Sequence, residues 1–288
     1  MIICRDGSTL NEDTTQDMIL EKLYTSCTGR MFMKVMSIPL FSNIACWVLT
    51  KRASKVLISP FIKKYQINMD QYEAVSYDNF DQFFSRNKKA ENRQIDETSH
   101  HLISPCDGKL TVYPLSENAH FDIKQSSYTL STLLKDESLA KKYTNGYALV
   151  FRLTVDNFHR YCYETDGSQE QTVRIPGILH SVNPIVNDYV PVYKENTREY
   201  CICQTEHFKE MIVMEVGALM IGRIVNHMKS GAFRKGQEKG YFRFGGSTIV
   251  LLFQENTLKM DDDILHNSTH GLETEVRFGE KIGMKKNN

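Results

Sequence analysis

Short apolar runs recur from about residue 100 to the end of the chain, and Gly, Pro and Asn residues separate them. The runs are rich in β-branched and aromatic residues, which favour strands. They are Leu102–Ile103, Lys109–Val112, Tyr147–Leu153, Thr172–Ile175, Tyr200–Gln204, Met211–Glu215, Ile249–Phe253 and Glu273–Phe278. This pattern predicts a β-rich antiparallel core, built as a sandwich or barrel-like domain, with a helical insertion over residues 130–143.

The chain before residue 97 has a different, helical character. Residues 19–66 carry apolar side chains at helical spacing, interrupted near Pro39 and Pro60. Phe80, Phe83 and Phe84 follow at the i, i+3, i+4 spacing of one helix face. We therefore expect an α+β fold with a helical region at 1–96 and a β-rich domain at 97–288, and we expect residues 1–18 to be loose or to cap the fold.

The charges of the helical region are one-sided, although the formal net charge of the whole chain is zero. Between Lys22 and Gln66 there are eight basic residues and no acidic one: Lys22, Arg30, Lys34, Lys51, Arg52, Lys55, Lys63 and Lys64. One interpretation is a helical layer packed on the core. The other is an interfacial surface that binds anionic lipids. The apolar run at 35–50 is shorter than the roughly 20 residues that span a bilayer. The zero net charge gives no indication of nucleic-acid binding.

The seven cysteines include no CxxC pair, and their number is odd. Neither a disulfide framework nor a zinc site is predicted from such spacing. Reduced thiols and the absence of a basic-then-apolar leader indicate a cytoplasmic setting. Cys201 and Cys203 point to one face of a predicted strand, where packing is the favoured role.

Gly245-Gly246-Ser247-Thr248 lies directly before the predicted strand Ile249–Phe253. Two glycines let the backbone turn sharply and leave the Gly246–Ser247 peptide bond with little steric protection. A serine hydroxyl is thereby held at the mouth of a rigid strand, beside that bond. The alternative is an ordinary β-turn, because Gly and Ser are common turn residues.

The segment Lys235–Thr248 resembles the self-cleavage segment of phosphatidylserine decarboxylases. Four other segments resemble motifs of the same family and follow in the family's order: Ser104–Leu110, Phe151–Tyr161, His180–Pro184 and Val216–Gly222. Together they cover roughly residues 70–283. On these motifs the chain is identified as a member of the phosphatidylserine decarboxylase family.

The resemblance implies a proenzyme that cuts itself between Gly246 and Ser247. The resulting chains, 1–246 and 247–288, stay associated as a heterodimer. Ser247 becomes a covalent pyruvoyl group, which forms a Schiff base with the substrate amine and takes up the electrons left by decarboxylation. Phosphatidylserine is converted to phosphatidylethanolamine without a metal or diffusible cofactor. The implied location is the cytoplasmic side of the cell membrane, on an anionic surface.

The resemblance also assigns roles to individual residues. Asp107 matches the charge-relay aspartate that orients a histidine, His159 is expected to be the general base, and Ser247 is the nucleophile. Family members often carry a second histidine, a candidate base for cleavage, where this chain has Cys162. Either His159 serves both cleavage and decarboxylation, or His180 or His101 supplies the second base. Arg160, Asn183 and His180 are candidates for positioning the substrate, and Arg160 and Asn183 could equally hold the fold together.

Three other functions stay open at this point. One is a pyruvoyl-dependent decarboxylase of another amino acid or lipid. Another is an uncleaved, non-catalytic scaffold that binds membranes. The third is a Ser-His-Asp lipid hydrolase, which the absence of a Gly-x-Ser-x-Gly elbow disfavours.

Overall fold

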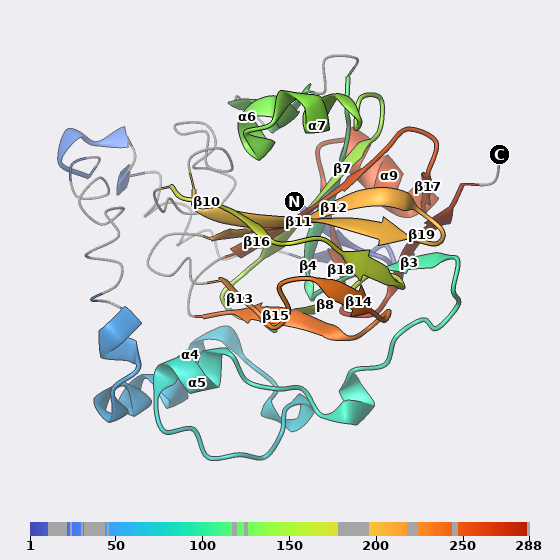
Figure 1. Ribbon diagram of the computed structural model, residues 1–288. Helices are drawn as coiled ribbons and strands as arrows, with labels where there is room; N and C mark the ends of the chain where they lie inside the picture. Colours follow the sequence, from blue (N-terminus) through green and yellow to red (C-terminus); the bar gives the residue numbers. More distant parts are fainter. Residues whose placement is uncertain are drawn as a thin grey trace.

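One large sheet dominates the molecule (Figure 1). The computed structural model describes residues 1–10, 22–23, 25–29, 31, 44, 46–116, 120–123, 126–177, 196–217, 224–243 and 247–286. Of the residues predicted to act in the site, His180, Asn183 and Gly246 lie outside these ranges.

The large sheet has 11 strands, and all its pairings are antiparallel except the pairing of β1 with β18. Its order is β14 (Gly231–Phe233), β9 (Gly167–Gln169), β11 (Arg198–Thr205), β12 (Lys209–Gly217), β16 (Ser247–Phe253), β7 (Tyr147–Leu153), β4 (Gly108–Pro114), β18 (Glu273–Val276), β1 (Ile2–Cys4) and β2 (Thr9–Leu10), with β10 (Val173–Ile175) paired to β11. Among the described strands the two ends of this order do not pair, so the sheet is open. The predicted antiparallel core is confirmed, but no closed barrel forms.

Three smaller sheets complete the strands that the structure describes. One contains β13 (Ile224–Asn226), β15 (Glu238–Phe242) and β8 (Arg160–Cys162), and we call it the small sheet. The second contains β17 (Leu258–Met260), β19 (Lys281–Lys285) and β3 (His101–Ile103). The third is the hairpin of β5 (His120–Ile123) and β6 (Ser126–Thr129).

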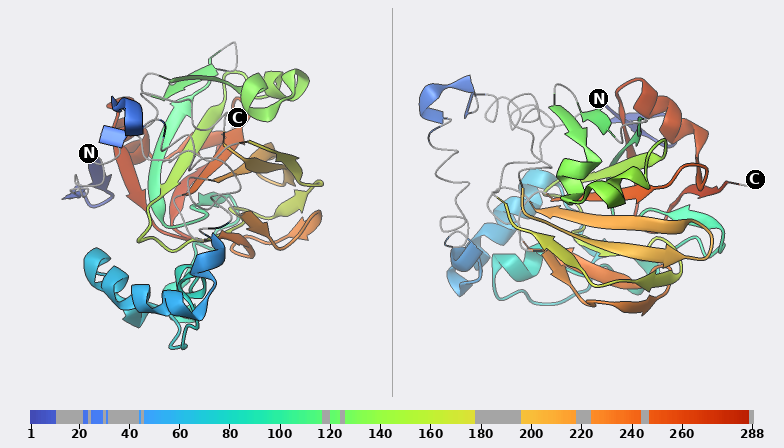
Figure 2. Two further views of the ribbon diagram at one scale, coloured as in Figure 1. Left: turned by 90° about the vertical axis from the view of Figure 1, so that its left-hand side faces the viewer. Right: turned by 45° about the horizontal axis from the view of Figure 1, so that its top comes forward.

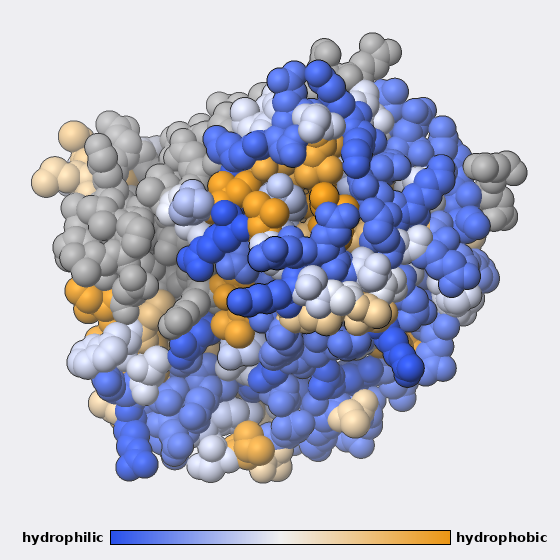
Figure 3. Space-filling model, in the orientation of Figure 1, coloured by the Kyte–Doolittle hydropathy of each residue, from blue (hydrophilic) through white to orange (hydrophobic). Residues whose placement is uncertain are grey.

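The central strands are buried on both faces because their apolar residues are continuous rather than alternating. On β16, Ile249 and Leu251 belong to one buried cluster, whereas Val250 and Leu252 belong to another. The small sheet contributes Tyr161 and Phe242 to the first cluster. The helices α6 (Leu130–Leu134) and α7 (Glu137–Lys141) cover the second, where Figure 3 shows apolar atoms gathered just below them. The predicted helical insertion is thus confirmed as two short helices.

The N-terminal helices form a separate layer beside the small sheet, at the bottom of Figure 1 and of the left view in Figure 2. This layer consists of η1 (Arg52–Leu57), α4 (Ile58–Tyr65), η2 (Met69–Gln71), α5 (Phe80–Phe84) and η3 (Ala90–Asn92). The expected aromatic face of α5 is confirmed, because Phe80, Phe83 and Phe84 are at most 2% exposed. The ring of Phe61 on α4 packs edge-on against Phe80 and Phe83.

Of the two alternatives for residues 1–18, the loose one is wrong for the first ten residues, where the structure places two strands at the sheet edge. Residues Ile2–Cys4 pair in parallel with Glu273–Glu275, and Ile2 is 1% exposed. The apolar residues at the start of the chain are buried at the edge of the main sheet, which is favourable. They were missed because the composition was averaged over 18 mostly polar residues. The last helix, α9 (Asp262–Thr269), packs beside β4 and β18.

Candidate active site

Ser247 is the first residue of β16, opposite Leu153 on β7 and Gly217 on β12. Its side chain alternates with those of Thr248 and Val250, so it points to the same face as Ile249, toward the small sheet. Ser247 is 1% exposed, and its hydroxyl has no hydrogen-bond partner among the described residues. A buried hydroxyl without a partner is uncommon, since burying it costs about 1–3 kcal/mol. Thr248 shares this property, but its side chain points to the opposite face, so Ser247 is the candidate for chemistry on the side of the small sheet.

The register of the sheet brings Asp107 to the same end as Ser247. Arg152 on β7 pairs with Thr248 on one side and with Lys109 on the other. Both neighbours of β7 are antiparallel to it, so β16 and β4 run in the same direction. Ser247 and Asp107 therefore lie at the same end of the sheet. Two strand spacings separate their backbones, which corresponds to about 10 Å.

His159 reaches this end through the turn that follows β7. The side-chain oxygen of Asn157 accepts hydrogen bonds from the backbone N–H and the hydroxyl of Thr154, both at 2.9 Å. The Nδ1 atom of His159 lies 2.9 Å from the carbonyl oxygen of Asn157. A carbonyl only accepts, so Nδ1 carries the proton, and Nε2 is the basic nitrogen of the neutral ring.

The surroundings of His159 connect it with the chain that leads into Ser247. Its ring is fully buried and lies 4.2 Å, between centroids, from Phe84 on α5. Its carbonyl oxygen accepts a 2.9 Å hydrogen bond from the backbone N–H of Phe242, the last residue of β15. Phe242 precedes Ser247 by five positions. His159 thus lies beside the end of β15, from which the chain continues to the predicted cleavage point.

The expected pairing of Asp107 with His159 is absent from the described contacts. The carboxylate of Asp107 forms a salt bridge with Lys88 and accepts a 2.9 Å hydrogen bond from the backbone N–H of Phe278. Lys88 also lies 5.2 Å from the ring centre of Phe158. Asp107 and His159 are brought to one end of the sheet, but their side chains are held by different partners.

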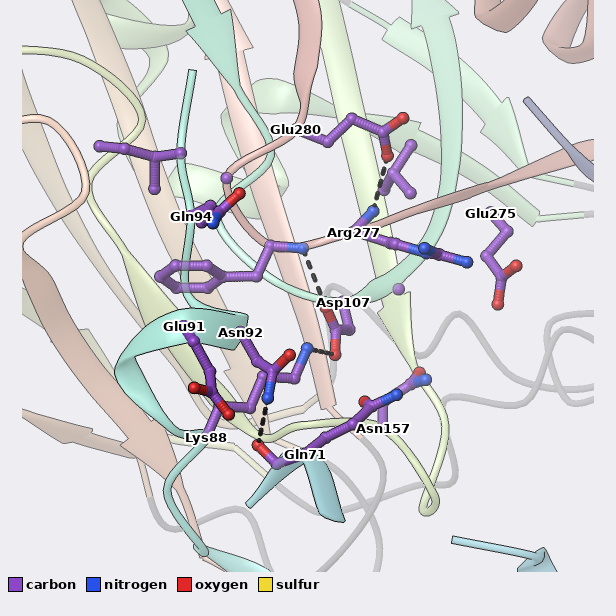
Figure 4. Close-up of a pocket in the computed structure, with 15 residues that line it drawn as sticks. Gln71, Lys88, Glu91, Asn92, Gln94, Asp107, Asn157, Glu275, Arg277 and Glu280 are labelled. Carbon is purple, nitrogen blue, oxygen red and sulfur yellow. Dashed lines mark hydrogen bonds and ion pairs between the residues drawn. The ribbon is translucent and has the colours of Figure 1, made fainter. Parts of the chain in front are cut away.

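A polar cavity of about 700 Å³ opens between β18, β4 and the N-terminal layer (Figure 4). Asp107 and Lys88 face it together with residues of both signs, namely Glu91, Glu275, Arg277 and Glu280. Asn157, whose carbonyl oxygen holds His159, lines it as well. The cavity therefore reaches Asp107 and the turn before His159, but neither His159 nor Ser247 is among the described residues that line it.

The chain just before the predicted cleavage point is tied to α5. The guanidinium of Arg243 forms a salt bridge with Asp81, with Nε 2.9 Å from Oδ2 and a second contact from Nη2. Two donors on one carboxylate give a geometrically specific link. We call it the Arg243 clamp. It fixes the position of the chain three residues before Gly246.

Arg160 is engaged within the fold rather than directed at the cavity. Its guanidinium forms a 2.7 Å salt bridge with Glu238 and donates a 2.9 Å hydrogen bond to the carbonyl oxygen of Ser85. Cys162 is fully buried, and burial raises the pKa of its thiol well above the usual value. A thiol of this kind packs and does not act as a base. His101, the alternative base suggested by the sequence, has its Nδ1 atom 3.0 Å from Oδ2 of Asp96.

Sequence reasoning missed Lys88, Asn157 and the Arg243 clamp. The spacing of Thr154 and Asn157 is a recognisable side-chain turn signal, and it could have indicated the bend before His159. Lys88 and the clamp give no local signal, because their partners lie 19 and 162 positions away. In the described part of the chain, no three His, Cys, Asp or Glu side chains come together in a group that could hold a metal ion.

Comparison with known proteins matches residues 80–284 to the family described as phosphatidylserine decarboxylase. The chain is 48% identical over 265 residues to phosphatidylserine decarboxylase proenzyme 2 of Clostridium acetobutylicum, covering 92% of this chain and 91% of that protein. It is 40% identical to the phosphatidylserine decarboxylase proenzyme of Clostridium botulinum (strain Langeland), with coverage of 96% and 95%. The corresponding proenzyme of Ruminiclostridium cellulolyticum is 34% identical, with coverage of 94% and 93%.

Proposed function

The chain belongs to the phosphatidylserine decarboxylase family, and we propose that it is a proenzyme that cuts itself between Gly246 and Ser247 before decarboxylating phosphatidylserine. The family membership carries the substrate and the reaction. The cleavage point rests on one observation. Ser247 is buried at the start of a central strand, and its hydroxyl has no hydrogen-bond partner in the described structure.

Self-cleavage requires a base, a nucleophile and a fixed peptide bond. We infer that Nε2 of His159 takes the proton of the Ser247 hydroxyl, whose oxygen attacks the carbonyl carbon of Gly246. The Gly246–Ser247 amide becomes an ester, and the amine of residue 247 is freed. Loss of the Cα proton of residue 247 then expels Gly246 as a carboxylate and leaves dehydroalanine. Addition of water and loss of ammonia convert that residue to a pyruvoyl group.

The surroundings of residue 247 suit a pyruvoyl group. This group supplies an electron sink for the carbanion that remains when an α-carboxylate is lost. Ser247 is almost fully buried beside apolar strands, so a ketone there would be shielded from competing reactions with water. After cleavage, β16 would stay paired over all seven of its residues with both β12 and β7. These pairings support two chains that remain together.

Asp107 is proposed to act at the same sheet end through the polar cavity. Its carboxylate is fixed by Lys88 and by the Phe278 amide, so its charge is oriented and compensated. The cavity has both cationic and anionic side chains, which suits a headgroup that itself carries an ammonium, a carboxylate and a phosphate. Arg160 and the undescribed residues Asn183 and His180 stay predictions as positioning residues.

Exposed residues at the start of the N-terminal layer and just before it are proposed to contact the membrane. Trp47, Val56 and Leu57 are 60%, 74% and 47% exposed, which is unusual for large apolar side chains. The ammonium of Lys51 lies 4.1 Å from the Trp47 ring centre. Exposed apolar and basic groups together suit the boundary of an anionic bilayer. Attachment to the cytoplasmic face of the cell membrane is the proposed location.

The same layer leads directly to the site. α4 contacts α5 through Phe61, and α5 holds both His159, through Phe84, and Arg243, through Asp81. A lipid headgroup entering from the membrane would thus approach along α5. None of the helices in the described ranges is both long and apolar enough to span a membrane.

The decisive experiment combines intact-mass spectrometry with a phosphatidylserine decarboxylation assay. The wild-type chain is expected to give fragments 1–246 and 247–288, the second with the mass of a pyruvoyl terminus. Ser247→Ala is expected to stay full-length and inactive, while the neighbouring control Thr248→Ser is cut. Cleavage of the Ser247→Ala chain at this bond would refute the serine mechanism. An uncut wild-type chain would favour the non-catalytic scaffold.

A further inference from the structure

Three polar side chains bond to one another between the main sheet and the small sheet, beside the first buried cluster. The ammonium of Lys239 lies 2.6 Å from Oε1 of Glu215 and donates a 3.1 Å hydrogen bond to the side-chain oxygen of Asn226. The amide nitrogen of Asn226 donates to Oε2 of Glu215 and to Glu199, each at 3.2 Å. The hydroxyl of Tyr161 donates to Asn226 at 3.1 Å. We call Lys239, Glu215 and Asn226 the buried charge network.

The free energy of folding does not explain why this buried position carries an ion pair. The side chains of Lys239 and Glu215 are 1% and 0% exposed. Removing two charges from water costs several kcal/mol per ion, and their attraction repays this only with well-satisfied geometry. Replacing a buried pair by apolar residues of similar volume is often neutral or stabilising. An apolar pair would fit here, because Val213 and Ile249 of the same cluster lie next to Glu215.

The buried charge network lies next to Ser247 on the main sheet. Glu215 pairs with Ile249, and two residues further along the same strands Gly217 pairs with Ser247. Side chains two positions apart on a strand point to the same face, so Glu215 and Ser247 are diagonal neighbours on one face of the sheet.

The network also joins the strands from which the chain enters and leaves the site. Glu215 lies near the end of β12, Asn226 is the last residue of β13, and Lys239 lies within β15. In sequence, residues 218–223 connect β12 to β13, and residues 243–246 connect β15 to Ser247. One polar cluster therefore ties β12, β13 and β15 to one another by side-chain hydrogen bonds.

We propose that Lys239, Glu215 and Asn226 are positioning residues for self-cleavage. Their hydrogen bonds hold β12, β13 and β15 in one mutual arrangement, so that the Gly246 carbonyl carbon stays in reach of the Ser247 hydroxyl. Directional bonds achieve this, whereas apolar packing tolerates sliding and rotation. The proposal rests on the proposed self-cleavage at Gly246–Ser247.

The test separates positioning from stability. Lys239→Met with Glu215→Leu removes both charges and keeps the volume. Self-cleavage is followed as the fraction of cut chain with time after cell-free synthesis. Thermal unfolding is measured on the same substitutions in the uncut Ser247→Ala background. We expect cleavage to be at least tenfold slower, with a Tm equal to or above that of Ser247→Ala alone.

A second ion pair supplies the matched control. Arg152 and Glu273 form a salt bridge with side chains 6% and 19% exposed. Arg152 pairs with Thr248, so it is as near to the cleavage point as the network is, but on the opposite face of the sheet. Arg152→Met with Glu273→Leu is expected to leave the cleavage rate unchanged.

A charge reversal asks whether the ion pair itself matters. Lys239→Glu with Glu215→Lys is expected to be cut faster than the apolar double variant. The proposal is overturned if the apolar variant is cut at the wild-type rate. It is also overturned if that variant's Tm falls by more than about 5 °C, since slow cleavage then reflects ordinary loss of structure. Wild-type chain that is never cut would instead refute the proposed function.

Discussion

Glu164 offers a quantitative test of the buried interior, because burial raises its pKa from 4.5 to about 8. The side chain is 1% exposed, and Oε1 has no hydrogen-bond partner among the described residues. Its backbone carbonyl oxygen accepts a 3.3 Å hydrogen bond from the N–H of Ile103, and a backbone hydrogen bond to the carboxyl lowers the pKa by less than burial raises it. The folded protein therefore holds this carboxyl protonated at neutral pH, whereas the unfolded chain ionises it.

The sign of the resulting pH dependence follows from proton counting. Between pH 4.5 and about 8 the folded state binds one more proton at Glu164 than the unfolded state. The free energy of unfolding then decreases by about 1.4 kcal/mol per pH unit. The contribution is fully present below pH 4.5 and is lost as the pH rises to about 8. From pH 5 to pH 8 the loss is about 3 to 4 kcal/mol.

Glu164→Gln removes the titration and keeps the shape. The measurement is urea unfolding of Ser247→Ala and of Ser247→Ala/Glu164→Gln, because an uncut chain gives a single transition to compare. The stability difference between the two chains should change by about 3 to 4 kcal/mol between pH 5 and pH 8, in favour of Gln at the higher pH. Parallel pH profiles would refute the burial argument.

Three other variants test the links between the N-terminal layer and the site. Asp81→Asn breaks the Arg243 clamp. It is expected to slow self-cleavage about 5- to 30-fold, because the transition state loses about 1–2 kcal/mol of stabilisation. The reversed pair Asp81→Arg/Arg243→Asp is expected to restore part of the rate. If the reversed pair is slower than Asp81→Asn, the clamp is not an ion-pair effect. Phe84→Ala should destabilise the uncut Ser247→Ala chain by about 3–5 kcal/mol in urea unfolding, because the ring is fully buried; a loss under 1 kcal/mol would contradict this packing. Trp47→Ala/Val56→Ala should lower the affinity for anionic liposomes at least tenfold in sedimentation. As a control, this double variant should still cut itself at the wild-type rate. Undiminished binding removes the membrane surface from the proposal.

The sequence predicted much of the secondary structure for a physical reason. Strand and helix periodicity depends on residues only a few positions apart. The run Tyr147–Leu153 coincides with β7, and the continuous apolar run Ile249–Phe253 indicated a buried strand, which proved central in the sheet. The Phe80, Phe83 and Phe84 spacing likewise predicted the buried face of α5. Motif order alone identified the family that comparison then matched over residues 80–284.

The site was predicted less completely. Ser247 and His159 were singled out, and the structure brings His159 to the strand end that leads to Ser247. In the described structure the carboxylate of Asp107 pairs with Lys88 and not with a histidine, and its charge-relay role stays a prediction. Nothing local distinguishes Lys88 from the other basic residues, and the chain offers 35 basic and 35 acidic side chains for pairing.

What the sequence by itself determined is therefore the family, the positions of the central strands of the main sheet and the serine at the mouth of one of them. Only the tertiary structure decided which charges pair: Lys88 with Asp107, Asp81 with Arg243, and Glu215 with Lys239. It also decided that the first residues join the main sheet. The reason is distance along the chain. Local patterns are set by near neighbours, whereas an ion pair depends on packing that brings distant segments together, and sequence carries no separate signal for it.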